Sequence, residues 1–442
     1  MITIFRALCV FSGMVFFFSC AEKKQQSSFH AMDTGILHQN QYQLTKIIIY
    51  DVFSPPVASR IYAYTSIAAY EAIRFAEPGY PSLAAQLHGF ADMPKPDKKK
   101  KYNYLLAATK AYFTVAHKIV FSIDTLKKYE NNVFDHFKNA LDEETYDHSV
   151  AFGEAVGNAV LQRAANDNYK KTRGMPKYLG GKEDGRWQPT TPDYLDGVEP
   201  FWSLIKPLAL DSASQFKPIR PPAFSKDKNS RFYKNALEVY EMRKNLTDSQ
   251  TTIVQYWDDN PFVMEHSGHL MFANKKITPG GHWMGIAAIA CRKVKAGQVP
   301  TAQTFALTAI ALFDGFIACW DEKYRSQYVR PISVIHALID DEWNSYLQTP
   351  PFPEHPSGHS TISASAATLL TKIFGDSFPF HDDSDKEYIG MERDFKTFFE
   401  ASDEASISRV YGGIHFRTGI ESGMKQGREV GRFISEKLKL KE

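Results

Sequence analysis

The sequence has little of the features that define several classes of protein. Only 4 of its 442 residues are cysteine, too few for a scaffold held by disulfides. Its 52 Lys and Arg nearly balance its 50 Asp and Glu, so it lacks the basic excess of nucleic-acid-binding proteins and the acidic excess of disordered chains. The 26 Gly and 23 Pro are close to average, which excludes fibrous classes. With 14% aromatic residues, the sequence predicts a large, packed globular protein that binds no nucleic acid.

The N-terminus carries a short apolar run that predicts export. In residues 1–19 a single early charge, Arg6, precedes an apolar stretch too short to span a membrane, which is typical of a signal peptide. A serine directly before Cys20 resembles a bacterial lipoprotein processing site, although Phe17 stands where such signals usually carry leucine. A plain signal peptide cut elsewhere is the alternative. We expect a periplasmic or cell-envelope lipoprotein whose only membrane contact is a lipid on Cys20.

The rest of the chain shows helical rather than strand periodicity. Alternation with a period of two is nearly absent and no internal repeat is visible, while helical spacing recurs at 57–75, 101–119, 124–141 and 143–171. The pattern predicts an all-α protein of helical bundles. Its expected parts are an anchor and tether at 20–45, an N-terminal helical region at 46–229 and a C-terminal bundle at 230–442. Within the N-terminal region, the segment 174–224 is rich in Gly and Pro, so we expect it to form a wrapping arm.

The most apolar of the predicted helices covers 301–325. Asp314 interrupts it, and we expect its apolar run to fall short of a membrane span, so its apolar circumference predicts the central helix of a bundle. Cys291 and Cys319 lie in the same apolar region. We expect both to be reduced and buried.

Three short clusters carry candidate chemistry, and the first contains two cations. Lys323 and Arg330 are seven residues apart and precede Pro331. If the helix continues through them, the two side chains share one face. Taken alone this pattern is weak, because two cations on a helix face are usually solvated.

The second cluster is Pro-Ser-Gly-His at 356–359, directly before a predicted helix. Free backbone N–H groups at a helix N-terminus form an anion-binding site. Ser357 is the expected N-cap, Gly358 offers its N–H, and His359 lies in the first turn.

The third cluster follows a predicted helix from about Glu387 to a glycine pair at 412–413. Arg409 lies in the last turn of that helix and His415 in the loop beyond it. Together the clusters supply one Lys, two Arg and a helix N-terminus, which can neutralise a tetrahedral oxyanion, and two histidines for bonding and proton transfer.

The three clusters, Lys-x6-Arg-Pro, Pro-Ser-Gly-His and Ser-Arg-x5-His, resemble the family that joins vanadium-dependent haloperoxidases with type 2 phosphatidic acid phosphatases and bacterial acid phosphatases. The segments 54–73, 185–202 and 278–287 also look like exported bacterial haloperoxidases, most of all bacterial vanadium iodoperoxidases. The resemblance implies a vanadate cofactor, with hydrogen peroxide and a halide, preferably iodide, as substrates.

The resemblance also implies a role for each residue of the clusters. Lys323, Arg330 and Arg409 would hold vanadate oxygens together with Ser357 and the Gly358 N–H. His415 would bond vanadium axially through Nε2, and His359 would be the acid–base group. Lys323 would also polarise the bound peroxide.

One position departs from the family pattern. Family members commonly carry Asp four residues after the metal-binding histidine, where it orients the ring, but here that position is Gly419. A ligating histidine normally has an acceptor on its other nitrogen. We expect Glu421 or a backbone carbonyl to take this place.

Four further residues are weaker candidates. Trp320 lies one helical turn before Lys323, so it and its neighbour Asp321 can share the pocket, or Trp320 can simply pack in the core. Phe352 stands where family chloroperoxidases carry Phe and bromoperoxidases His, and His355 lies close by. An apolar aromatic pocket is compatible with iodide.

Two other functions fit the same residues. An exported acid phosphatase would bind phosphate in place of vanadate and use His415 as the nucleophile. A lipoprotein that only binds an oxyanion would need the cations but not His359. The sequence leaves the oligomeric state and any organic acceptor open.

Overall fold

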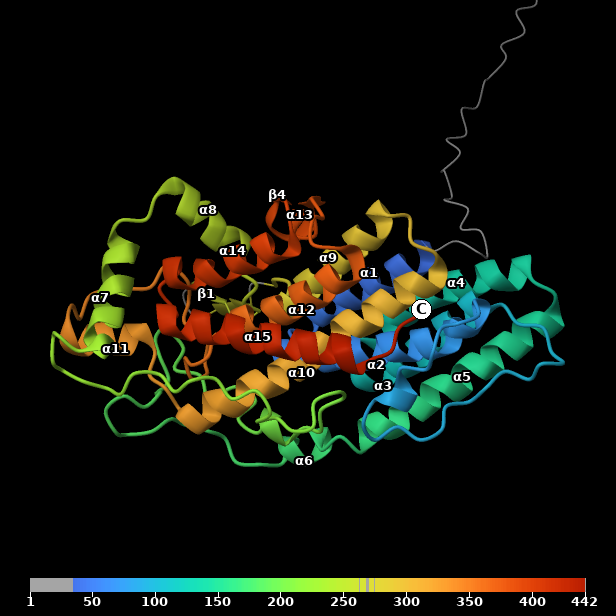
Figure 1. The fold of residues 1–442 in the computed structure, drawn as a ribbon, viewed down its shortest axis with the longest axis horizontal. Coiled ribbons are helices and arrows are strands. Elements are labelled where there is room, and N and C mark those ends of the chain that lie inside the picture. The colour runs from blue at the N-terminus through green and yellow to red at the C-terminus, as the bar shows by residue number, and fades with distance from the viewer. Residues whose placement is uncertain (1–34, 262, 268–269, 274, 442) are drawn as a thin grey trace, which may run out of the picture.

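The structure, a computed structural model, describes residues 35–441 apart from 262, 268–269 and 274. Within this part of the chain it contains fifteen α-helices and four short strands, so the all-α prediction is confirmed (Figure 1). The strands form two antiparallel pairs, β1 (Met264–Ser267) with β2 (Leu270–Ala273) and β3 (Phe380–Asp382) with β4 (Arg393–Phe395). The sequence analysis did not predict these strands.

The N-terminal half is built from helices close to the predicted ranges, preceded by one helix that the sequence analysis did not predict. They are α1 (Gly35–Tyr50), α2 (Pro55–Ile73), α3 (Tyr104–Ile119), α4 (Ile123–Ala140), α5 (Glu143–Ala165) and α6 (Tyr169–Arg173), with the short 3₁₀ helices η1 (Arg74–Ala76) and η2 (Ala84–Gln86). The predicted tether at 20–45 was therefore wrong for residues 35–45. These residues form most of α1, because Ile36, Leu37 and Leu44 are buried in the core. The predicted signal peptide and Cys20 lie outside the described residues.

The C-terminal half holds the remaining helices. They are α7 (Arg231–Lys244), α8 (Asp248–Tyr256), α9 (Pro279–Lys293), α10 (Gln298–Ser326), α11 (Pro331–Leu338), α12 (Gly358–Phe374), α13 (Lys386–Ile389), α14 (Phe398–Tyr411) and α15 (Arg417–Lys437). The predicted helix start near Glu387 was wrong, because Gly390 ends α13 in a left-handed conformation (φ 72°) and β4 follows before α14 begins.

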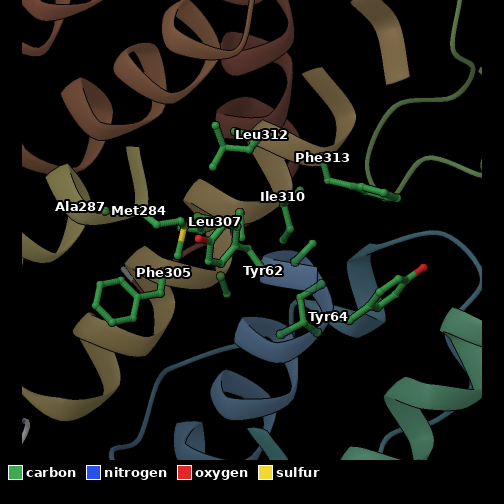
Figure 2. Packing of buried hydrophobic residues seen from close by; sticks show 14 of the residues in the cluster. Tyr62, Tyr64, Met284, Ala287, Phe305, Leu307, Ile310, Leu312 and Phe313 are labelled. Carbon is green, nitrogen blue, oxygen red and sulfur yellow. The ribbon is translucent and has the colours of Figure 1, made fainter. Parts of the chain in front are cut away.

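The central helix of the molecule is α10. It packs against α2, α9 and α12, and Figure 2 shows side chains of α2, α9 and α10 meeting in the core. By length and composition α10 could cross a membrane, so the sequence analysis underestimated its apolar run, but its most apolar window is completely buried. The main core cluster contains residues from both halves of the chain. The predicted boundary between two parts at 229/230 stays a prediction.

The segment predicted as a wrapping arm joins α6 to α7 and contains only one short 3₁₀ helix, η3 (Trp202–Leu204), as Figure 1 shows in green. Its contacts with α10 explain why it is ordered without regular structure. The Val198 carbonyl accepts hydrogen bonds from Trp320 Nε1 at 3.2 Å and from the Tyr324 hydroxyl at 2.6 Å. The arm thus lies over the part of α10 that carries Trp320 and Tyr324.

Asp314 is the main anchor of the arm on α10. Its fully buried carboxylate accepts hydrogen bonds from three consecutive backbone N–H groups of the arm, at 2.7 to 2.8 Å, from Leu208, Ala209 and Leu210. The charged residue that interrupts the apolar helix therefore satisfies backbone groups that would otherwise be buried without partners.

Glycines let α15 approach α12 closely. A Cβ on Gly427 would lie 2.0 Å from the Thr361 carbonyl oxygen, and one on Gly423 would lie 2.7 Å from the Ser357 carbonyl oxygen. Any larger residue at these positions would push the helices apart. The spacing of these glycines therefore holds the N-terminus of α12, where the site lies, against α15.

Asp314→Ala tests the anchor. Because three buried N–H groups lose their acceptor, we expect the free energy of unfolding in urea to fall by about 3 kcal/mol or more. Asp321→Ala on the same helix removes a partly exposed carboxylate and should change it by no more than about 0.5 kcal/mol. Equal losses in the two variants would contradict the anchor.

Candidate active site

The N-terminus of α12 forms the floor of the candidate site. Ser357 is its N-cap and accepts a hydrogen bond from the Ser360 N–H at 3.3 Å, as the sequence predicts. Gly358 is the first residue of the helix, and a Cβ there would lie 3.3 Å from the Trp320 ring. This glycine keeps the helix end close to α10, with free N–H groups available to an anion.

Lys323 is completely buried beside this helix end. Its Nζ donates hydrogen bonds to the carbonyl oxygens of Pro353 and Glu354, at 2.8 and 2.9 Å. Burial lowers the pKa of Lys323 to about 7. Carbonyl groups hold the ammonium in place without cancelling its charge, so it stays available to an anion.

Arg330 reaches the same space from a different element than predicted. The helix does not continue from Lys323, because α10 ends at Ser326 and Gln327 is left-handed (φ 50°). The shared helix face was therefore wrong, and Pro331 begins α11 rather than ending α10. The Arg330 guanidinium donates to the carbonyls of Phe352 and Ile414, at 2.9 and 2.7 Å, and its Nη1 lies 3.2 Å from His415 Nε2.

Arg409 lies in the last turn of α14, as predicted, and faces His359. Its Nη1 is 3.4 Å from His359 Nε2, and its Nη2 donates to the Trp257 carbonyl. Burial, followed by Arg409, holds the pKa of His359 well below its usual value. His359 is therefore a neutral imidazole next to a cation, with 15% of its side chain exposed.

His415 has its ring orientation set by Glu354. Its Nδ1 lies 2.8 Å from Glu354 Oε1, which also accepts from the Phe416 N–H at 3.1 Å. Burial and the nearby Arg330 keep the pKa of His415 well below its usual value. A neutral ring that donates from Nδ1 leaves the lone pair of Nε2 free for a metal.

The carboxylate on His415 Nδ1 belongs to Glu354. The prediction that Glu421 takes this place was wrong. Glu421 lines a separate surface pocket with Arg220 and Lys425. The absence of a side chain at Gly419 explains the exchange: a Cβ there would lie 2.1 Å from Glu354 Oε1. The carboxylate that family members commonly place at position 419 therefore comes here from the loop before α12.

An apolar pocket opens beside the two histidines. Trp320, Phe352 and Phe316 line it together with His359 and His415. The placement of Trp320 and Phe352 in the pocket is confirmed. Phe352 also packs 5.0 Å from Trp320, measured between ring centroids.

Two neighbouring candidates do not reach the pocket. Asp321 turns away and pairs with Arg325 at 2.8 Å, so its predicted place in the pocket was wrong. His355 turns away as well, with Nε2 3.0 Å from the Ile219 carbonyl oxygen. Cys291 and Cys319 are reduced and buried as predicted, and Cys319 Sγ lies 3.7 Å from the Pro356 carbonyl oxygen.

Four residues near the site were missed by the sequence analysis. They are Phe316 in the pocket, Glu354, Trp257 through its carbonyl, and Asp259, whose Oδ2 lies 3.8 Å from His359 Nε2. Gly419 was the available signal for Glu354, since a missing carboxylate calls for another one nearby. Nothing in the local sequence marks Trp257 or Asp259, because they reach the site only through the packing of α8 against α14.

The fold matches that of proteins with known structures. Residues 303–441 match the family model described as VCPO second helical-bundle domain. Holo and apo crystal structures of a bacterial vanadium-dependent chloroperoxidase share the fold, at 18% sequence identity with TM-scores of 0.69 and 0.67. They cover 88% and 87% of this chain, and 93% and 94% of their own. The fold is therefore that of vanadium-dependent haloperoxidases.

A closer similarity shows the family itself. The crystal structure of a bacterial vanadium-dependent iodoperoxidase is 43% identical, covers 93% of this chain and 98% of its own, and has a TM-score of 0.88. The chain belongs to the vanadium-dependent haloperoxidase family. A comparison with curated protein sequences gives no match.

The Glu354–His415 contact makes a specific prediction for vanadate affinity. Glu354→Ala removes the acceptor of His415, and we expect the dissociation constant of vanadate, measured by equilibrium dialysis, to rise by about tenfold to a hundredfold. Glu354→Gln keeps an acceptor oxygen and should cost less.

Glu421→Gln is the matched control and should leave the affinity unchanged. A Glu421→Gln loss as large as that of Glu354→Ala would restore Glu421 to the role that the structure gives to Glu354.

Proposed function

We propose that this protein is a vanadate-dependent haloperoxidase that oxidises halide, preferably iodide, with hydrogen peroxide. The observation that carries the proposal is the set of three buried cations held by carbonyl oxygens around a helix N-terminus, with His415 Nε2 facing one of them, Arg330. This set of donors fits a tetrahedral oxyanion of several negative charges. The 43% identity to a bacterial iodoperoxidase supports it.

The residues would divide the binding of vanadate among them. Lys323, Arg330 and Arg409 would contact its oxygens with the Gly358 N–H, and His415 Nε2 would bond the metal. Bound vanadate supplies a Lewis acid that activates hydrogen peroxide for attack by halide. Lys323 would add a positive charge at the reacting oxygens. Burial lowers the pKa of its amine, and the bound anion would favour the protonated form.

His359 is placed to transfer protons. Its neutral imidazole can accept a proton from an incoming peroxide and return it to the departing oxygen. Arg409 at 3.4 Å disfavours a lasting positive charge on the ring, so the proton is readily released.

The halide would enter through the apolar pocket. Trp320, Phe352 and Phe316 give it weakly hydrated walls. Iodide is the largest and most easily oxidised of the common halides, and it loses little on leaving water for such a pocket. These side chains and the similarity to an iodoperoxidase are the grounds for preferring iodide.

Iodide oxidation by the purified protein with hydrogen peroxide tests the proposal. We expect activity to appear on loading with vanadate and to fall when phosphate competes, because both anions use the same cations. Lys323→Ala should lower the activity by about a hundredfold or more, since it removes a buried charge at the reacting oxygens. Hydrolysis of a phosphate ester by the same sample, without iodide oxidation, would favour the phosphatase instead.

We also propose that the chain is exported and anchored by a lipid on Cys20. The support is the signal-like pattern of residues 1–19 and the serine before Cys20. Cys20→Ser should abolish incorporation of radiolabelled palmitate and release the protein from the membrane fraction. Cys291→Ser is the control and should do neither, since Cys291 is buried in α9. Unchanged labelling of the Cys20→Ser variant would exclude the anchor.

A further inference from the structure

A second cluster of ionisable side chains is buried behind His359. It consists of His282 in α9 and three aspartates, Asp259 after α8, Asp382 at the end of β3 and Asp385 before α13. All four are at most 2% exposed. Three separate segments therefore bring their charges to one point in the interior, where an uncompensated charge is costly.

His282 Nδ1 faces three carboxylate oxygens, at the long end of the hydrogen-bond range or beyond it. Asp259 Oδ1 and Oδ2 lie 3.2 and 3.3 Å away, and Asp385 Oδ2 lies 3.5 Å away. A charged N–H···O bond is about 2.7–2.9 Å long, and one N–H cannot serve three acceptors well. Ligand atoms around a tetrahedral ion with bonds of 2.0–2.1 Å are about 3.3 Å apart, which matches the observed spacing.

The other ring nitrogen has an ordinary partner. His282 Nε2 lies 3.0 Å from Asp382 Oδ2, while Asp382 Oδ1 accepts from the Ser384 N–H and hydroxyl at 3.1 and 2.6 Å. The Trp257 ring stacks on the imidazole at 4.5 Å between centroids. A histidine that binds a metal through one nitrogen typically donates its other N–H to such a supported carboxylate.

Asp385 provides an independent indication of a missing ligand. Its Oδ1 is buried and has no hydrogen-bond partner, although almost all buried polar atoms have one. One oxygen each from Asp385 and Asp259 lies with a His282 nitrogen in a group of atoms within 4.8 Å of one another. Burial raises the pKa of Asp385, while the neighbouring His282 opposes this shift.

We propose that Asp259, Asp385 and Nδ1 of His282 bind a divalent transition-metal ion of the zinc type, next to the pocket that His359 and His415 line. Two carboxylates and one imidazole are ligands that zinc accepts, whereas calcium and magnesium take sets of oxygen ligands. Asp382 orients His282 for this role. The competing arrangement, a protonated His282 that bridges the aspartates without an ion, leaves Asp385 Oδ1 without a partner.

The ion has a positioning role towards the active site. Asp259 Oδ2 lies 3.8 Å from His359 Nε2, so an ion on Asp259 fixes the carboxylate nearest to the acid–base histidine. It also links α9 with the chain after α8 and the segment around β3. The inference does not depend on which halide is oxidised, or on vanadate binding.

Zinc content of the full mature chain tests the site. The protein is made without a polyhistidine tag, incubated with zinc chloride, desalted and measured by mass spectrometry of the metal. We expect about one zinc per chain in the wild type and in Asp394→Asn, an exposed aspartate of β4, and less than about a tenth in Asp385→Asn. Equal zinc in Asp385→Asn and the wild type, or only traces in the wild type, would overturn the proposal.

A measurement on the wild type alone keeps the proposal falsifiable if Asp385→Asn does not fold. Crystals soaked in zinc should show an anomalous peak at the zinc edge about 2.0–2.1 Å from His282 Nδ1. Zinc should also raise the melting temperature of the wild type. A zinc peak at other residues only, or no peak, would exclude the site.

Discussion

The structure depends on how it buries three cations without neutralising them. Lys323, Arg330 and Arg409 lose their hydration, and carbonyl oxygens of neighbouring loops replace it. Carbonyl groups stabilise a cation through dipoles and leave its net charge in place. The low pKa of the buried lysine shows the cost of this arrangement. A multiply charged oxyanion would offset that cost, so these three cations suit such a ligand.

The same constraint explains several features that seem unrelated. The loop at 349–357 presents carbonyl groups to two cations and leads into the N-terminus of α12. The arm covers this loop, and the Val198 N–H donates to the Pro351 carbonyl at 2.8 Å. Asp314 fastens that arm to α10, and glycines of α15 hold α12 in place. Residues far from the chemistry thus keep the charged groups at fixed distances.

The two histidines differ because their surroundings differ. His415 has a carboxylate on Nδ1, which sets the tautomer and makes Nε2 a ligand atom. His359 faces Arg409 and, further away, Asp259, so it stays neutral while it can still exchange a proton. Gly419 leaves room for the carboxylate on His415 Nδ1 to come from the loop before α12, because a Cβ at position 419 would lie 2.1 Å from Glu354 Oε1.

The sequence by itself determined the helical class, the central helix and the identity of the principal residues, because these follow from local periodicity, helix capping and short motifs. It could not place Arg330 relative to Lys323, since a single left-handed residue turns the chain between them. It also could not assign Glu354 to His415 or bring Asp259 to His359. Such contacts join residues far apart in the chain, and only tertiary packing decides them.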